Sequence, residues 1–165
     1  MPLLALNRPV ASRGVTSPLE DDVDRTLVAL LATDGRATLS TLASAAGLSV
    51  SATQARVRRL EQRGVIRGYA ADIDPEALGL PLAAFIAISP LDPAQPDDAP
   101  EQLAELDAVE ACYSVAGEDS YVLLVRVPSP RALEDLIRQI RSVANVRTRT
   151  TVILQTFYER RLSHP

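Results

Sequence analysis

The sequence contains no lysine and no tryptophan, and only one cysteine and one histidine, among its 165 residues. A single cysteine, Cys112, excludes an internal disulfide framework and favours a reducing compartment, so we expect a cytoplasmic protein. The lone histidine, His164, stands next to the C-terminus, and no Cys/His/Asp cluster has metal-ligand spacing. We therefore expect neither a metal nor another cofactor. No apolar run is long enough to span a membrane, so no membrane partner is expected.

The charge is unevenly distributed along the chain. The net charge is −4, but residues 1–75 hold nine arginines against eight acidic residues, whereas residues 76–165 hold eight against thirteen. Residues 49–69 contain five arginines and a single acidic residue, Glu61. A positive segment within an acidic chain favours contact with nucleic acid.

Two short amphipathic helix patterns, separated by a glycine, lie within Leu39–Ile66. Thr38 can cap the first helix, Gly47 can end it, and Ser49 can cap the second. A further helix pattern, Leu19–Thr33, precedes them. Three helices in this order predict a helix-turn-helix domain, and a short strand pattern over residues 65–73 predicts a wing after it.

The second helix of this pair has the features of a DNA recognition helix. At 100° per residue, Val50, Thr53, Val57 and Leu60 fall on the side expected to be buried. The opposite side is small at its start and basic later, which lets the backbone approach base edges while arginines reach phosphates or guanine. The candidate DNA-binding residues are Ser49, Ser51, Ala52, Ala55, Arg56, Arg58 and Arg59. The alternative is a solvated arginine face on an ordinary helix.

Strand and helix patterns alternate in the second half of the chain. Strands are predicted at residues 82–89, 109–116, 121–127 and 146–158, and helices at 101–106 and 130–144. The order β-α-β-β-α-β predicts an α+β, ferredoxin-like domain whose antiparallel sheet carries both helices on one face. The other face stays bare and apolar. Its simplest partner is a second copy of the chain, which predicts a homodimer.

The chain resembles the leucine-responsive/asparagine-responsive (Lrp/AsnC, feast/famine) transcriptional regulators. The resemblance rests on Asp21–Leu31, Asp34–Arg36, Leu48–Ser49, Arg56–Glu61 and Gly64–Tyr69. It implies a winged helix-turn-helix domain that binds double-stranded DNA, joined by a strand-containing hinge to a ferredoxin-like domain. The second domain is expected to dimerise, to assemble dimers into octamers and to bind a free amino acid between dimers. The expected division is a disordered arm (1–18), the DNA-binding domain (19–73), the hinge (74–81), the effector domain (82–160) and a tail (161–165).

The loop between the two central strands is the implied effector site. In the family this loop typically reads Gly-x-x-Asp-Tyr, and the aspartate meets the amino group of the ligand. Ser120 stands at the aspartate position here, and the carboxylates lie one and two residues earlier. The implied effector-binding residues are Gly117, Glu118, Asp119, Ser120 and Tyr121. The alternative is a hairpin turn without a ligand, since Gly, Asp and Ser are common in turns.

Two other functions compete with effector-controlled regulation. One is an architectural DNA-binding protein without an effector. The other is an enzyme, because some relatives of this fold decarboxylate siroheme-type tetrapyrroles, but such chemistry needs a buried histidine or a clustered acid–base pair. The sequence offers neither, so we expect a protein that is not an enzyme.

Overall fold

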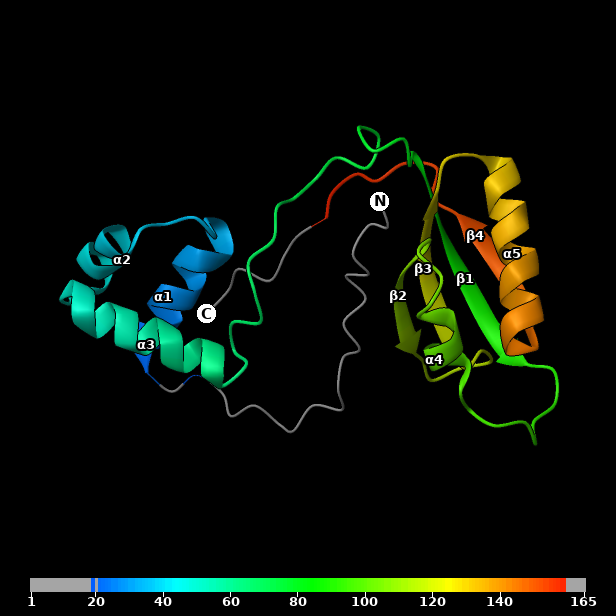
Figure 1. The fold of residues 1–165 in the computed structure, drawn as a ribbon, viewed down its shortest axis with the longest axis horizontal. Coiled ribbons are helices and arrows are strands. Elements are labelled where there is room, and N and C mark those ends of the chain that lie inside the picture. Colours follow the sequence, from blue (N-terminus) through cyan, green and yellow to red (C-terminus); the bar gives the residue numbers. More distant parts are fainter. Residues whose placement is uncertain (1–18, 20, 160–165) are drawn as a thin grey trace. The chain divides into compact units, whose positions relative to one another are not determined.

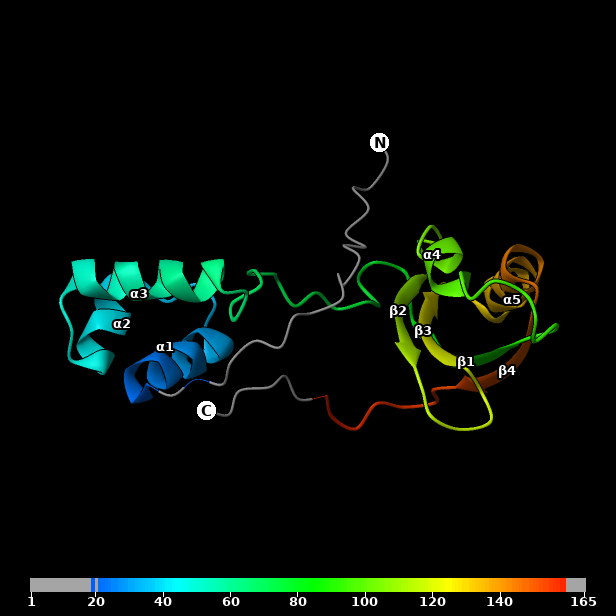
Figure 2. The same ribbon diagram turned by 90° about the horizontal axis from the view of Figure 1, so that it is seen from below.

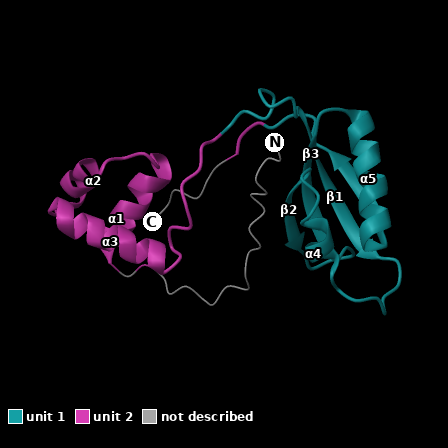
Figure 3. Ribbon diagram, viewed as in Figure 1, with its two compact units in different colours: residues 1–10, 73–156 teal, residues 11–72, 157–165 magenta. Residues whose placement is uncertain are grey.

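The computed structural model describes residue 19 and residues 21–159. The predicted arm and the predicted tail lie outside these residues. The described chain divides into two compact units, one containing residues 21–72 and the other residues 73–156 (Figure 3).

The first unit contains three helices, α1 (Asp22–Thr33), α2 (Leu39–Ala46) and α3 (Val50–Gln62) (Figure 1). The predicted caps of α2 and α3 are confirmed, because Thr38 Oγ1 accepts from the Thr41 N–H at 3.1 Å and Ser49 Oγ accepts from the Ala52 N–H at 3.2 Å. Gly47 ends α2 in the left-handed region with a φ of 66°. The first helix begins at Asp22 rather than Leu19, because the side chain of Asp21 caps it.

The core of this unit is formed by Leu27, Leu42, Val57 and Leu60. The helical periodicity of α3 predicts this packing from Thr53 onward, and Thr53 is fully buried. The prediction is wrong for Val50, the first residue of α3, which is 49% exposed.

The predicted wing is not formed. No strand occurs in residues 65–73, which continue without regular structure as far as the turn at Pro75. A β-strand is defined by its ladder of hydrogen bonds to a neighbouring strand, and among the described residues no strand pairing involves this segment. The strand expected in the hinge, residues 74–81, is not formed either. The first unit is therefore a helix-turn-helix without wing strands.

The second unit has the predicted order of elements. Its members are β1 (Leu82–Pro90), α4 (Ala99–Leu103), β2 (Val109–Ser114), β3 (Tyr121–Val127), α5 (Pro130–Ala144) and β4 (Val146–Val152). The strands lie in the order β2-β3-β1-β4 and all neighbours are antiparallel. Figure 2 shows α4 and α5 on the same side of the sheet. The α+β, ferredoxin-like prediction is confirmed.

The inward residues of the strands and helices form one core. Ile86, Leu123, Val125 and Ile140 are each fully buried within it. These positions follow the two-residue period of the strands and the 3.6-residue period of α5, which is why the sequence pattern predicts them. Within the described residues, no helix has the length and apolarity that a membrane span requires.

The predicted bounds of three elements in this unit are wrong by two residues or more. The last strand ends at Val152 rather than at residue 158, β2 ends at Ser114 rather than at residue 116, and the short helix covers residues 99–103 rather than 101–106. The early end of β4 follows from its register. Val152 pairs with Ala84, and β1 begins at Leu82, so after the hydrogen bond from the Ile153 N–H to the Ala83 carbonyl little of β1 remains for further pairing.

Gly47 should be less tolerant of a side chain than Gly35 in the same unit. We expect Gly47→Ala to cost about 1 kcal/mol, because alanine is strained in the left-handed region. A Cβ at Gly35 would lie 3.6 Å from the Tyr69 ring, an ordinary contact, and Gly35 has no such φ. Urea denaturation followed by helical circular dichroism measures both variants. Equal loss of stability in the two variants would contradict this account of α2.

Candidate functional site

The predicted DNA-binding residues lie on the outer side of α3 and at its N-cap. The side chains of Ser49, Ser51, Ala55, Arg58 and Arg59 are exposed, whereas Ala52 and Arg56 are partly buried. The small residues occupy the first part of the helix and the arginines the second part. This order leaves room for another backbone or a base edge near the N-terminus of α3.

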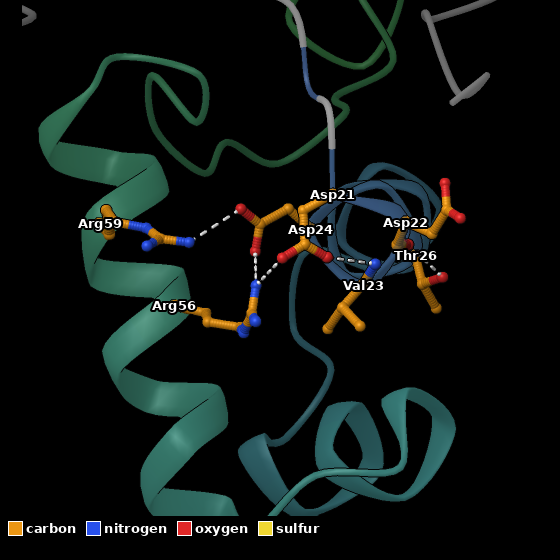
Figure 4. Close-up of polar contacts among 7 residues, drawn as sticks. All are labelled: Asp21, Asp22, Val23, Asp24, Thr26, Arg56 and Arg59. Carbon is orange, nitrogen blue, oxygen red and sulfur yellow. Dashed lines mark hydrogen bonds and ion pairs between the residues drawn. The ribbon is translucent and has the colours of Figure 1, made fainter.

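Two arginines of α3 contact carboxylates at the start of α1 (Figure 4). Arg56 Nη1 lies 2.5 Å from Asp21 Oδ2 and 2.8 Å from Asp24 Oδ1. Arg59 Nη2 lies 3.2 Å from the other oxygen of Asp24. The Asp24 side chain is only 3% exposed, so its charge is balanced almost entirely by these two guanidinium groups.

This cluster holds α3 against α1. The hydrogen bond from Arg56 lowers the pKa of the Asp21 carboxyl, with further lowering by the backbone N–H of Val23. Asp21 therefore stays ionised, and Arg56 remains paired, below the pH at which an ordinary aspartate is protonated. Since its Nη1 contacts both carboxylates, Arg56 has a role within the domain that the sequence pattern does not indicate.

Arg58 has different surroundings. Among the residues that the structure describes, it makes no ion pair, and its side chain is exposed on α3. Of the three arginines predicted to contact DNA, Arg58 makes no ion pair within the described residues, Arg59 pairs with one carboxylate and Arg56 pairs with two.

Sequence reasoning missed Asp24. The signal was present, because Asp24 stands three residues before buried Leu27 and so shares the inner face of α1. A carboxylate at such a position needs a cationic partner, and the arginines of α3 are the nearest in the fold.

The five predicted effector residues are brought together by one loop, but they line two different hollows. Glu118 and Asp119 line a hollow of about 300 Å³ with Ser89, Arg147, Thr148 and Arg149. Ser120 and Tyr121 line a larger one of about 440 Å³, which Ser89 also borders. Gly117 lines neither. Thus the loop lies between two adjoining hollows.

The smaller hollow contains both charge signs. Asp119 accepts a hydrogen bond from Ser89 Oγ at 3.3 Å and forms an ion pair with Arg149. The Arg149 side chain is 69% exposed and that of Asp119 is 19% exposed. The N–H groups of residues 117–119 have no hydrogen-bond partner within the described chain. A carboxylate, a guanidinium and free N–H donors together match a small zwitterion.

The larger hollow is bordered by Ile88, Val115 and Tyr121. The Tyr121 hydroxyl donates to Asp97 Oδ1 at 2.7 Å. This bond, followed by burial, raises the pKa of Tyr121 to about 12, so the phenol is neutral at physiological pH. Ser120, at the position where the family has an aspartate, donates its backbone N–H to the Ile88 carbonyl at 3.0 Å.

Within residues 21–159 no group of three or more His, Cys, Asp or Glu side chains has the geometry of a metal site. His164 lies outside the described residues. Cys112 is exposed on β2, not buried as its apolar surroundings in the sequence suggest.

Comparison with protein-family models gives two matches. Residues 21–61 match the AsnC-type helix-turn-helix domain, and residues 83–163 match the Lrp/AsnC ligand binding domain. The first match contains α1, α2 and most of α3, and the second contains all of the sheet except the first residue of β1, together with both hollows.

Comparison with known proteins gives close relatives. The chain is 68% identical over 145 residues to the HTH-type transcriptional regulator LrpA of Mycobacterium tuberculosis, covering 88% of this chain and 97% of that protein. A feast or famine regulatory protein from M. tuberculosis complexed with L-methionine has 68% identity and a TM-score of 0.86, over 88% of this chain and 99% of that one. A transcriptional regulator from Neisseria meningitidis, also in an L-methionine complex, has 27% identity and a TM-score of 0.78, over 89% of this chain and 97% of that one.

Proposed function

The chain belongs to the Lrp/AsnC family of transcriptional regulators, and on that premise we propose that α3 binds double-stranded DNA sequence-specifically while a free amino acid, bound in the second unit, controls this binding. The observation that carries the proposal is the pairing of an exposed, basic α3 with a zwitterion-sized hollow of mixed charge in one chain.

DNA contact is assigned to the exposed side of α3. Ser49, Ser51, Ala52 and Ala55 are small enough to let the helix enter a major groove and read base edges. Arg58 and Arg59 then reach phosphates on the flanking backbone. Arg56 is given the internal role, since its Nη1 already pairs with both Asp21 and Asp24.

Arg58→Ala should weaken binding to any duplex DNA. Loss of one phosphate contact reduces the slope of log affinity against log salt by roughly 0.9. Arg131→Ala is the matched control, because Arg131 is an exposed arginine of α5 in the other unit. Fluorescence anisotropy across a salt series measures both slopes. Arg131→Ala should keep the wild-type slope. If Arg58→Ala keeps it too, Arg58 makes no phosphate contact.

Dimerisation is assigned to the sheet face opposite the helices. Cross-strand pairs place Tyr113 beside Val122, and Phe85 beside Leu124, on this face. Phe85 is 43% exposed and Tyr113 is 54% exposed. A second copy packed on this face would remove these side chains from water, and a two-fold pair of DNA-binding units suits paired half-sites. Assembly of dimers into an octamer is proposed from family membership.

Phe85→Glu should convert the dimer into a monomer, because a carboxylate at the centre of an apolar interface would be buried without a partner. Val143→Glu is the control, since Val143 is 42% exposed but lies on α5, on the opposite side of the sheet. Light scattering at micromolar concentration gives the mass of each variant. A wild-type monomer, or an unchanged mass in Phe85→Glu, contradicts the proposed interface.

The effector is assigned to the smaller hollow. An α-ammonium group can replace Arg149 beside Asp119, while the α-carboxylate pairs with an arginine of β4 and with the free N–H groups of residues 117–119. Since Ser89 borders both hollows, the side chain of the ligand can extend toward Ile88 and Val115. The L-methionine complexes of two relatives support an amino acid with an apolar side chain.

Asp119→Asn should weaken L-methionine binding by roughly tenfold to a hundredfold, because a charge-assisted hydrogen bond becomes a neutral one. Asp107→Asn makes the same charge change at an exposed residue outside both hollows. Isothermal calorimetry measures the affinities, and light scattering with and without L-methionine reports any change of assembly. Equal affinities of the wild type and Asp119→Asn for L-methionine would place the effector site elsewhere. If the wild type binds none of the twenty amino acids, an architectural protein is favoured.

A further inference from the structure

Asp24 is the only charged residue that is buried among those the structure describes. Its two carboxylate oxygens have different partners, one contacting Arg56 at 2.8 Å and the other Arg59 at 3.2 Å (Figure 4). Burial of a carboxylate is unfavourable unless its charge is matched and its oxygens accept hydrogen bonds. Both conditions are met by arginines of α3, so the recognition helix completes the site that Asp24 requires.

The two arginines are bound to different degrees. Arg56 is 28% exposed and uses the same nitrogen for Asp21 and Asp24. Arg59 is 54% exposed and gives only Nη2 to Asp24. A guanidinium has five N–H donors in a rigid plane. Arg59 therefore keeps N–H donors accessible to solvent while its contact with Asp24 fixes its position.

Arg59 also lies at the edge of the outer side of α3. It stands four residues after exposed Ala55, which places both side chains on one face of the helix. A phosphate that approaches this face would meet a guanidinium already oriented by Asp24. Preorganisation of this kind reduces the side-chain entropy lost on binding and fixes the register of the contact.

The same carboxylate limits binding to unrelated DNA. Without Asp24, Arg56 and Arg59 would carry charge that one partly exposed carboxylate, Asp21, balances only in part. Additional unpaired positive charge raises affinity for every duplex through phosphate contacts and counterion release. This additional affinity does not depend on the base sequence.

We propose that Asp24 is a positioning residue for sequence-specific DNA binding, an inference that rests on the DNA binding proposed above. By holding Arg59, it fixes one phosphate contact in register with the base-reading end of α3. By neutralising Arg56, it keeps affinity for unrelated DNA low. Asp24 thus sets the ratio between specific and non-specific binding without contacting DNA.

The test compares two duplexes, one selected by the wild-type protein from a random-sequence library and one scrambled duplex of the same base composition. Asp24→Asn in the full chain should lower the affinity ratio between them by roughly tenfold, about the effect of one mismatched base pair. Affinity for the scrambled duplex should rise and its salt slope should steepen, by up to about 0.9 for each arginine that gains a phosphate.

Asp22→Asn is the matched control. It removes the same charge from the same turn of α1, but Asp22 is 91% exposed and pairs only with Arg25 on its own helix. Asp22→Asn should keep the wild-type ratio. If the two variants lower the ratio equally, the effect is one of net charge and the inference is wrong.

A double-mutant cycle separates positioning from a loss of helix packing. In an Arg59→Gln background, Asp24→Asn should change the affinities for the selected and the scrambled duplex alike, because the residue that Asp24 positions is already gone and the charge released on Arg56 acts on every duplex. Equal effects in both backgrounds would mean that Asp24 only stabilises the domain, which overturns the inference.

Arg59→Lys decides the question if Asp24→Asn does not fold, since Arg59 lies at the surface. Lysine keeps the charge but lacks the fork that spans Asp24 and a phosphate. The salt slope should stay as in the wild type while the affinity ratio falls roughly tenfold. An unchanged ratio overturns the inference, but it leaves the proposed function standing as long as the wild type prefers the selected duplex. A wild type that discriminates no duplex removes both.

Discussion

The contact between α1 and α3 is the constraint on which the DNA-binding unit depends. Its apolar part is the core around Leu27, Leu42 and Leu60, and its polar part is the buried carboxylate of Asp24 with two arginines. The apolar part stabilises the fold without fixing direction, because the hydrophobic effect is non-directional. The ion pairs supply direction, since they hold α3 at one rotation and one axial position relative to α1. The contacts on the inner side of α3 therefore determine which of its residues are exposed.

A second constraint acts on the other unit. A four-stranded sheet whose helices lie on one side must leave the opposite side to solvent or to a partner. Here that side carries Phe85 and Tyr113, which are large and exposed, instead of the polar residues usual on a solvated sheet. The same strands that bury Ile86 and Leu123 in the core thus present an apolar surface behind it. One chain architecture accounts for both the domain core and the proposed dimer.

The loop after β2 connects this sheet with the proposed control by an amino acid. Its carboxylate, Asp119, contacts Ser89 on β1 and Arg149 on β4, so the loop is tied to two neighbouring strands of the sheet. A zwitterion that separates Asp119 from Arg149 would exchange an internal ion pair for two external ones. Such a ligand alters assembly only by its difference in affinity between the assembled states. The proximity of this ion pair to the bare sheet face makes such a difference physically reasonable, because Arg149 pairs in register with Ala87 on that face.

The sequence alone determined the elements whose signals are local. The caps at Thr38 and Ser49, the stop at Gly47 and the period of α5 each act within a few residues, so the helices and the strand order were predictable from them. The small-then-basic order along α3 and the Gly117–Tyr121 loop were visible for the same reason.

Tertiary structure decided the features that depend on residues distant in the chain. Asp24 meets Arg56 only after α1 and α3 pack, β4 ends near the first residues of β1, and residues 65–73 form no strand within the described chain. Pairing of charges and strands is a property of the neighbours that folding provides, and a linear pattern does not contain it.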